Sequence, residues 1–363
     1  MKKAILYLED GRKFIGQALS VPGETSGEVV FNTSLTGYQE ILTDPSYAGQ
    51  IVVMTYPLIG NYGVNLEDVE SGKVHVKGFV AKEFCKYHSN YRANKSLIEY
   101  LHDHNIIAIE DIDTRALTRH LRERGAMRAI ISTVDFDDRS LAEKMKKVPS
   151  MEGADWVKEV STSKPYIWPM PQGVTPVYKV AAIDCGIKWN ILRIFASLGC
   201  EVHVFPSIAT PEQLLAIKPD GVFISNGPGD PAAVTSVIST VKQLLGKLPV
   251  FGICLGQQIL GLAMGGKTYK LKFGHHGANH PVKDFVYDRI GITSQNHGFC
   301  VDLKSLGPDV EMINVNLNDK TMEGLRHKKL PIVSFQHHPE ASPGPHDVHY
   351  LFEYFIDLMK RKP

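Results

Sequence analysis

Residues 249–261 read Pro249-Val-Phe-Gly-Ile-Cys254-Leu-Gly-Gln-Gln258-Ile-Leu-Gly261. The apolar run before Cys254 is typical of a buried strand, and residues 255–264 carry helix formers with apolar residues at helical spacing. Cys254 therefore falls at the junction of a strand and a helix. Gly252 and Gly256 flank it and relieve crowding around a sharp turn. The stretch predicts an elbow in an α/β fold that presents a nucleophilic thiol.

A helix N-terminus changes the chemistry of the Cys254 thiol. The helix dipole and a nearby imidazolium both favour the thiolate, which is the nucleophilic form. The amide of Leu255 follows the nucleophile directly and is placed to stabilise an oxyanion, a contribution of typically about 3 kcal/mol for one donor. A buried structural cysteine is the alternative for an isolated Cys. The choice depends on whether a base and its orienting group accompany Cys254.

Both partners are present near the end of the chain. An apolar run at residues 330–336 predicts a strand, which leads into His337-His338-Pro339-Glu340. A histidine followed across a proline by a carboxylate suits a general base and the group that orients it. A large separation in sequence is normal, because triads are assembled in space.

Gly252-Ile-Cys254-Leu-Gly256 together with Gln336-x-His338-Pro-Glu340 resembles the class I glutamine amidotransferases. Further motifs extend the resemblance over essentially the whole chain, to the small subunits of carbamoyl-phosphate synthases. These motifs are Leu42-Thr-Asp-Pro-Ser46-Tyr, Asn226-Gly-Pro-Gly-Asp-Pro231, Leu271-Lys-Phe-Gly-His-His-Gly-Ala-Asn279 and Ser294-Gln-Asn296-His-Gly298-Phe299. Their occurrence in the expected order makes the resemblance specific.

The resemblance implies a role for each motif. Cys254 attacks the side-chain amide of glutamine, His338 moves the proton to the leaving ammonia, and Glu340 orients His338. The remaining implied site residues bind glutamine or its oxyanion and are Ser46, Gly227, Gly229, Leu255, Gln258, Asn296, Gly298 and Phe299. Gln258 also lies one helical turn from Cys254, which places it on the same side of the helix. Without the resemblance, Ser46 is an ordinary turn serine, and Gly227 and Gly229 mark a tight turn.

The implied function is that of a glutaminase subunit, which passes ammonia to a large subunit that uses ATP and bicarbonate. No cofactor or metal is expected in this chain. The expected partners are the carbamoyl-phosphate synthase large subunit and L-glutamine, without nucleic acid or membrane. Two alternatives remain open: a glutaminase that serves another synthase, such as one for anthranilate or guanylate, and a non-catalytic regulatory module.

Composition agrees with this class of protein. The chain has 363 residues, a formal net charge of +1 and 22% charged residues, so nothing in its charge suggests an acidic polymer as partner. The first residues do not resemble a signal peptide, and no apolar run approaches a membrane span. Five scattered cysteines without C-x-x-C spacing suit free thiols in a reducing cytoplasm.

Patterning divides the chain in two. We expect a mixed, β-rich α+β domain at residues 1–150, which the resemblance implies to dock onto the large subunit, and a proline-rich linker at 151–177. From residue 178 to 363, strands alternate with helices, which predicts a doubly wound, mostly parallel sheet. The resemblance makes this domain a class I amidotransferase fold of flavodoxin-like type.

Four patterns are weighed against more ordinary explanations. The segment from Gly261 to Thr268 matches the letters of a phosphate loop, but it is expected to end a helix and enter a strand. Arginines between residues 115 and 124 suggest a solvated or partner-facing helix in preference to a nucleic-acid site. His275 and His276 lack further ligands at metal-site spacing. His337 is expected to be a neighbouring or surface residue.

Overall fold

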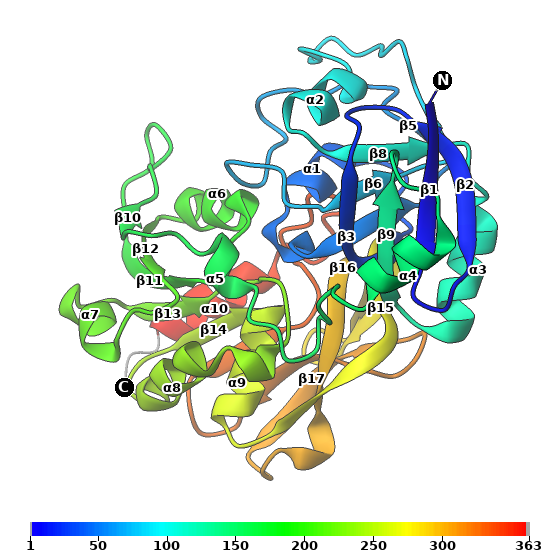
Figure 1. Cartoon of the computed structure of the whole chain (residues 1–363). Helices are drawn as coiled ribbons and strands as arrows, with labels where there is room; N and C mark the ends of the chain where they lie inside the picture. The colour runs from blue at the N-terminus through cyan, green and yellow to red at the C-terminus, as the bar shows by residue number, and fades with distance from the viewer. Residues whose placement is uncertain (1, 361–363) are drawn as a thin grey trace. The chain divides into compact units, whose positions relative to one another are not determined.

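The computed structural model describes residues 2–360 and divides them into two compact units. Unit 1 runs to Ala154 and includes Lys272–Gly277, and unit 2 consists of Asp155–Leu271 and the chain from Ala278 onward. Figure 1 shows the elements of both units. Among residues 2–360, no helix combines the length and apolar content needed to span a bilayer.

Unit 1 is built on a closed barrel whose strands follow the order β1-β2-β8-β6-β4-β3-β9. Pairing of β1 with β9 closes it. The pairs β3/β4, β4/β6 and β6/β8 are parallel, and the other neighbours are antiparallel. The elements of unit 1 are β1 (Lys2–Leu8), β2 (Lys13–Ala18), β3 (Glu24–Asn32), α1 (Tyr38–Thr43), η1 (Pro45–Tyr47), β4 (Gln50–Met54), β5 (Leu58–Ile59), β6 (Gly78–Val80), β7 (Glu83–Phe84), α2 (Leu97–Asp103), β8 (Ile107–Glu110), α3 (Thr114–Arg124), β9 (Met127–Ser132) and α4 (Asp138–Met145).

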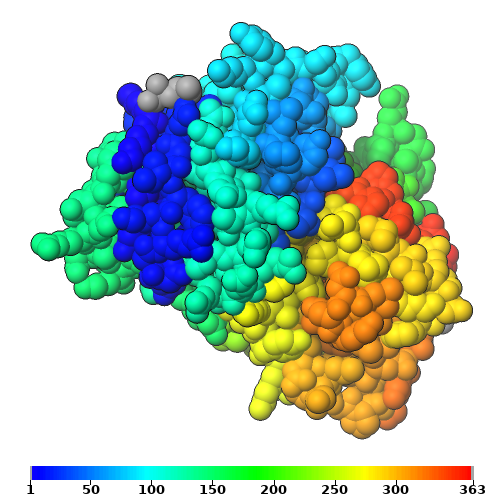
Figure 2. All heavy atoms as spheres, turned by 90° about the vertical axis from the view of Figure 1, so that its right-hand side faces the viewer, coloured from blue at the N-terminus to red at the C-terminus, as the bar shows by residue number. Residues whose placement is uncertain are grey.

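Alternation of side chains along the strands creates two apolar layers in unit 1. One buried cluster takes residues from every barrel strand, among them Leu6, Phe31 and Val53, and therefore fills the barrel interior. Leu117 and Leu121 of α3 pack on this same cluster. The alternate residues of β3, β4 and β6 pack against α1 and α2. Figure 2 shows the first two strands, in dark blue, at the surface of this unit.

Unit 2 contains a 10-stranded sheet in the order β10-β12-β11-β13-β14-β19-β18-β17-β15-β16. The strands β12, β11, β13, β14 and β19 are mutually parallel, and antiparallel strands flank them. The elements are α5 (Val157–Val160), β10 (Tyr166–Ile167), β11 (Tyr178–Asp184), α6 (Trp189–Ser197), β12 (Cys200–Pro206), α7 (Pro211–Ala216), β13 (Gly221–Ile224), η2 (Pro231–Ala233), α8 (Thr235–Leu244), β14 (Val250–Ile253), α9 (Leu255–Ala263), β15 (Lys267–Asp284), β16 (Arg289–Asp302), η3 (Leu303–Ser305), β17 (Val310–Asn316), β18 (Met322–His327), β19 (Ile332–Phe335) and α10 (Leu351–Lys360).

Helices cover both faces of the parallel strands. One face, with Ala182 and Phe251, packs against α6 and α10. The other, with Ile183 and Val250, packs against α7, α8 and α9. The doubly wound, mostly parallel sheet predicted from the alternation of strands and helices is confirmed.

The segment at residues 151–177 differs from the predicted linker. It contains helix α5 and strand β10, and β10 pairs antiparallel with β12 at the edge of the sheet. Ser161 Oγ accepts a hydrogen bond from Ser207 N, and Thr162 N donates to Asp184 at 2.7 Å. Its prolines thus interrupt secondary structure without preventing the segment from packing on unit 2.

Candidate active site

Cys254 lies at the elbow between β14 and α9, as the sequence predicts. Its backbone has φ 54° and ψ −106°, a conformation that residues other than glycine rarely adopt. Cys254 N donates to Phe335 O at 2.8 Å, which ties the elbow to the neighbouring strand β19. The surrounding structure therefore holds a strained residue in place, a feature that clusters at functional sites.

The flanking glycines are required by close backbone packing. A Cβ atom on Gly252 would lie 2.7 Å from the carbonyl carbon of Gly256. A Cβ atom on Gly256 would lie 2.2 Å from the carbonyl oxygen of Ile224 in the adjacent strand. No side chain fits at these distances, so the elbow depends on both glycines.

His338 follows the end of β19 and is wholly buried. Its backbone N–H donates to Ser294 O at 2.9 Å, and its Nδ1 lies 2.6 Å from Glu340 Oε1. Burial by itself lowers the pKa of His338, but the charges of Glu340 and Cys254 and the hydrogen bond to Glu340 raise it to about 10. Cys254, His338 and Glu340 thus form one interacting group, in which the imidazolium form of His338 is favoured at neutral pH.

Lys188 completes the group and was not predicted. This lysine is 1% exposed; its Nζ lies 3.0 Å from Glu340 Oε1 and donates to Ala341 O at 2.5 Å. Burial raises the pKa of Glu340, but the charges of Lys188 and His338 lower it to about 2. Glu340 therefore stays ionised at physiological pH. A signal was available, since Lys188 follows the carboxyl end of a predicted parallel strand, the sheet edge where ligands bind.

Two asparagines fix the backbone around this ion pair. Asn190 Nδ2 donates to Glu340 O at 2.7 Å, and Asn226 Oδ1 accepts from Lys188 N at 3.2 Å. The loop that begins at Asn226 follows β13, next to β14 in the sheet. These contacts join the segments that follow β11, β13 and β19.

Two predicted oxyanion elements lie side by side. Leu255 is the first residue of α9, so its N–H has no acceptor within the helix. A Cβ atom on Gly227 would lie 2.0 Å from Cys185 O and 2.9 Å from Leu255 Cδ2, so this loop packs directly against the start of the helix. Gly229 has φ 92°, which favours glycine.

Strand β16 and helix α9 supply the other predicted residues of unit 2. Asn296 O lies 3.6 Å from the Cys254 Sγ, so Asn296 borders the thiol. Gln258 is buried, and its Nε2 donates to Phe299 O at 2.7 Å and to Gln336 Oε1 at 3.2 Å. An added Cβ on Gly298 would meet open space. Asn296 is thus placed at the thiol, whereas the amide nitrogen of Gln258 is engaged within the protein.

Ser46 lies in unit 1, in η1, where its N–H donates to Asp44 Oδ1 at 2.9 Å. It is buried, and its contact with glutamine stays a prediction. His275 and His276 also belong to unit 1. The ring of His276 lies 6.2 Å from that of Tyr47, and its carbonyl accepts from Thr33 N. His276 therefore has structural contacts within the barrel unit.

His337, expected to be a neighbouring or surface residue, is a buried neighbour of His338, so the surface alternative is wrong. Its side chain is fully buried, and its Nδ1 lies 3.5 Å from Glu323 Oε2. Side chains alternate along an extended chain, so consecutive residues point to opposite sides. His337 consequently faces Glu323, while His338 meets Glu340.

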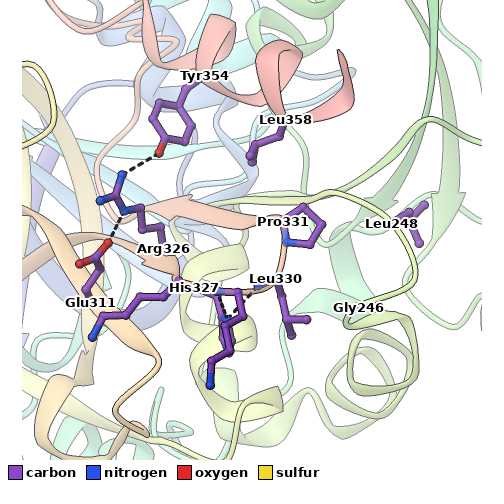
Figure 3. A pocket seen from close by; sticks show the side chains of 11 residues that line it. Gly246, Leu248, Glu311, Arg326, His327, Leu330, Pro331, Tyr354 and Leu358 are labelled. Atoms are coloured by element: carbon purple, nitrogen blue, oxygen red, sulfur yellow. Dashed lines mark hydrogen bonds and ion pairs between the residues drawn. The ribbon is translucent and has the colours of Figure 1, made fainter. Parts of the chain in front are cut away.

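The phosphate-loop pattern lies as predicted, since α9 ends at Ala263 and β15 begins at Lys267. A separate hollow of about 640 Å³ lies near the loop before β19, shown in Figure 3. There Arg326 contacts Glu311 and Tyr354. The hollow lies at the N-terminal ends of β14 and β19. Cys254 and His338 follow the C-terminal ends of the same two strands, so the hollow and the thiol lie at opposite edges of the sheet.

Comparisons with known proteins agree with this geometry. Residues 6–131 match the family model for the carbamoyl-phosphate synthase small chain, CPSase domain, and residues 181–358 match that for class-I glutamine amidotransferases. Carbamoyl phosphate synthase small chains are similar over nearly their whole length. That of Syntrophotalea carbinolica is 55% identical over 99% of this chain and 98% of the relative. That of Nitratidesulfovibrio vulgaris is 53% identical over 99% of this chain and 98% of the relative. That of Aquifex aeolicus is also 53% identical, over 98% of this chain and 99% of the relative. The chain therefore belongs to the carbamoyl phosphate synthase small chain family, and its second half carries a class-I glutamine amidotransferase domain.

Proposed function

We propose that this chain hydrolyses L-glutamine to glutamate and ammonia, and that the ammonia passes to a large chain for ATP- and bicarbonate-dependent synthesis of carbamoyl phosphate. The observation that carries the proposal is the buried group of Cys254, His338 and Glu340, in which Glu340 binds His338 Nδ1 at 2.6 Å. A strained elbow presents the nucleophile, and an ionised carboxylate fixes the base. These are the parts that covalent amide hydrolysis requires.

The reaction follows from these roles. The Cys254 thiolate attacks the side-chain amide carbon, and the oxyanion forms beside the N–H of Leu255. The His338 imidazolium gives its proton to the nitrogen, ammonia leaves, and a thioester remains. Water then attacks the thioester while neutral His338 takes the proton, which releases glutamate and restores the thiolate. Gly227, Gly229, Gln258, Asn296, Gly298, Phe299 and Ser46 are proposed to bind glutamine or its oxyanion.

The assembly and the location are part of the proposal. The names of the relatives imply a large partner chain in a heterodimer, and the match of residues 6–131 to a small-chain model argues against a glutaminase of another synthase. The cysteines at 85, 185, 200, 254 and 300 are all unpaired, which supports a reducing cytoplasm. The product would serve arginine or pyrimidine synthesis.

Ammonia release from glutamine tests the proposal, measured for the purified chain alone and with a large chain. We expect release that increases with the large chain and is abolished in Cys254→Ser. Cys85→Ser, which changes a cysteine in unit 1, is the matched control and should retain activity. A folded chain that releases no ammonia under either condition would support the non-catalytic alternative.

A further inference from the structure

A hollow of about 510 Å³ lies in unit 1, between helix α3 and the residue that follows β4. Three threonines and three arginines line it: Thr55, Thr114, Thr118, Arg115, Arg119 and Arg122. The lining contains no acidic side chain. Figure 1 shows α3 on the outside of the barrel strands. The hollow thus combines guanidinium groups with hydroxyl groups at an accessible surface.

The three arginines have no internal partner. Across residues 2–360, no hydrogen bond or ion pair engages the guanidinium of Arg115, Arg119 or Arg122. Several other arginines are paired, for example Arg92 with Asp68 and Arg128 with Glu9. The arginine cluster differs from these ion-paired arginines.

The hollow in Figure 3 provides a direct contrast. It is also rich in basic residues, but Arg326 binds Glu311 and Tyr354 there, and Lys329 binds Asp309 at 2.8 Å. Lys328 donates to Pro308 O at 2.7 Å. Its positive charges are thus neutralised or engaged by the protein, whereas those along α3 are available to an external anion.

Helix stability does not explain the cluster. Arg115 lies in the first turn of α3, close to the positive end of the helix dipole, where a cation is unfavourable. Arg119 follows it by four residues and Arg122 follows Arg119 by three, so like charges are neighbours on the helix surface. Packing is provided by Leu117 and Leu121, which are buried in the barrel cluster. Arg122 lies in the last turn, where a cation is favourable, but the mutual repulsion of the three charges would be offset by an anionic ligand.

We propose that this hollow binds a small anion with more than one phosphoryl group. Guanidinium groups bind phosphate oxygens in a bidentate manner, and threonine hydroxyls add further hydrogen bonds. From Arg115 to Arg122 the helix rises about 10 Å, which suits a chain of phosphoryl groups better than a single phosphate. The volume lies within the usual range of small-molecule sites. A concave wall also favours a small ligand over a flat acidic protein surface.

Isothermal titration of the full chain with inorganic triphosphate tests the proposal, with orthophosphate and citrate as comparisons. We expect saturable binding that is weaker for orthophosphate and citrate and weaker at high salt. Arg119→Ala should weaken triphosphate binding at least about tenfold, since it removes a charged hydrogen-bond donor. Arg124→Ala is the matched control, because Arg124 is exposed on the same helix but does not line the hollow. Thermal unfolding of each variant should match that of the parent chain.

Three outcomes would overturn the proposal. They are the absence of saturable triphosphate binding, an equal loss in Arg119→Ala and Arg124→Ala, and citrate binding as tight as that of triphosphate. If triphosphate does not bind but Arg119→Ala no longer associates with a large chain, the hollow is a docking surface for an acidic protein segment. The inference does not depend on glutamine hydrolysis, since the lining residues all lie in unit 1.

Discussion

Replacing Lys188 by methionine tests whether the buried ion pair supports the group of Cys254, His338 and Glu340. The substitution keeps most of the side-chain volume but removes the charge 3.0 Å from Glu340 Oε1. Removing one partner of a buried pair leaves an uncompensated charge and typically costs about 3 to 5 kcal/mol. The pKa of Glu340 gives a similar figure. Its fall from 4.5 to about 2, at about 1.4 kcal/mol per unit, corresponds to about 3 kcal/mol, of which Lys188 gives the largest favourable part and His338 a further part.

The sign of the pH dependence follows from that pKa. A carboxylate whose pKa is lowered on folding contributes stability that is present above its unfolded pKa of 4.5 and is lost as the pH falls through about 2. We therefore expect Lys188→Met to lose about 3 kcal/mol of unfolding free energy at pH 7. The difference from the parent chain should shrink as the pH falls below about 4.5, because Glu340 in the variant then becomes protonated.

Urea unfolding at several pH values measures this effect. Lys82→Met is the matched control, because Lys82 is also ion-paired, to Asp111 at 2.7 Å, but both side chains are about half exposed. Exposed pairs contribute under about 1 kcal/mol, so the control should lose little. The reasoning is refuted if Lys188→Met and Lys82→Met lose similar amounts at pH 7, or if the loss caused by Lys188→Met does not depend on pH.

Three further predictions concern the same site. Gly256→Ala places a methyl carbon 2.2 Å from a backbone carbonyl oxygen. Urea unfolding should therefore show that the free energy of unfolding falls by at least about 2 kcal/mol. In the control Gly298→Ala the added methyl group faces open space, so the free energy of unfolding should change little. Glu340→Gln preserves volume but removes the carboxylate, and we expect ammonia release to fall at least about a hundredfold; a loss under tenfold would contradict its assignment. The pKa of His338 is about 10, so its imidazolium persists below that pH and is lost above it. Carbon-13 NMR of labelled histidine should show the His338 ring unchanged from about pH 6 to 9. Alkylation of Cys254 should lower the pKa of His338, because it removes the charge of Cys254. If His338 in the unmodified protein titrates like an ordinary histidine, the assignment is contradicted.

Local patterning predicts the elements at the Cys254 elbow well. The apolar run at residues 250–253 is strand β14, and Cys254 lies at the start of α9. This succeeds because a short apolar run, two glycines and a helix former determine the local backbone, and the nearest packing contacts reinforce it. The doubly wound sheet is equally predictable, because alternating strands and helices leave few other ways to bury both faces.

The closed barrel of unit 1 and the position of β10 depend on distant pairings. Strands such as β6 (Gly78–Val80) are short, and their neighbours β4 and β8 lie far away in sequence. Residue patterning shows that such segments are strands but not which strands they join. For the same reason the proline-rich segment at 151–177 was predicted as a linker, although β10 pairs with β12 there.

Side-chain environments were the least predictable part of the site. Lysine is almost never fully buried unless it is paired, so sequence alone favours an exposed position for Lys188. Its burial becomes understandable only once Glu340 and Ala341 are located beside it. For His337 a surface position was one of two expectations, because a polar side chain beside His338 is as easily solvated as buried, yet it is enclosed with Glu323.

Lys188, Glu340, His338 and Cys254 form a series of charges that alternate in sign when Cys254 is a thiolate. Burial lowers the pKa of His338, and the charges of Glu340 and Cys254 raise it. In the proposed reaction, attack on the amide transfers the electron pair of the thiolate into the new carbon–sulfur bond, so the negative charge moves from the sulfur to the oxyanion beside the N–H of Leu255. Glu340 stays ionised because Lys188 is unchanged. His338 thus becomes a stronger acid at the step in which the leaving nitrogen needs a proton, and the thiolate that reappears when the thioester is hydrolysed raises its pKa again.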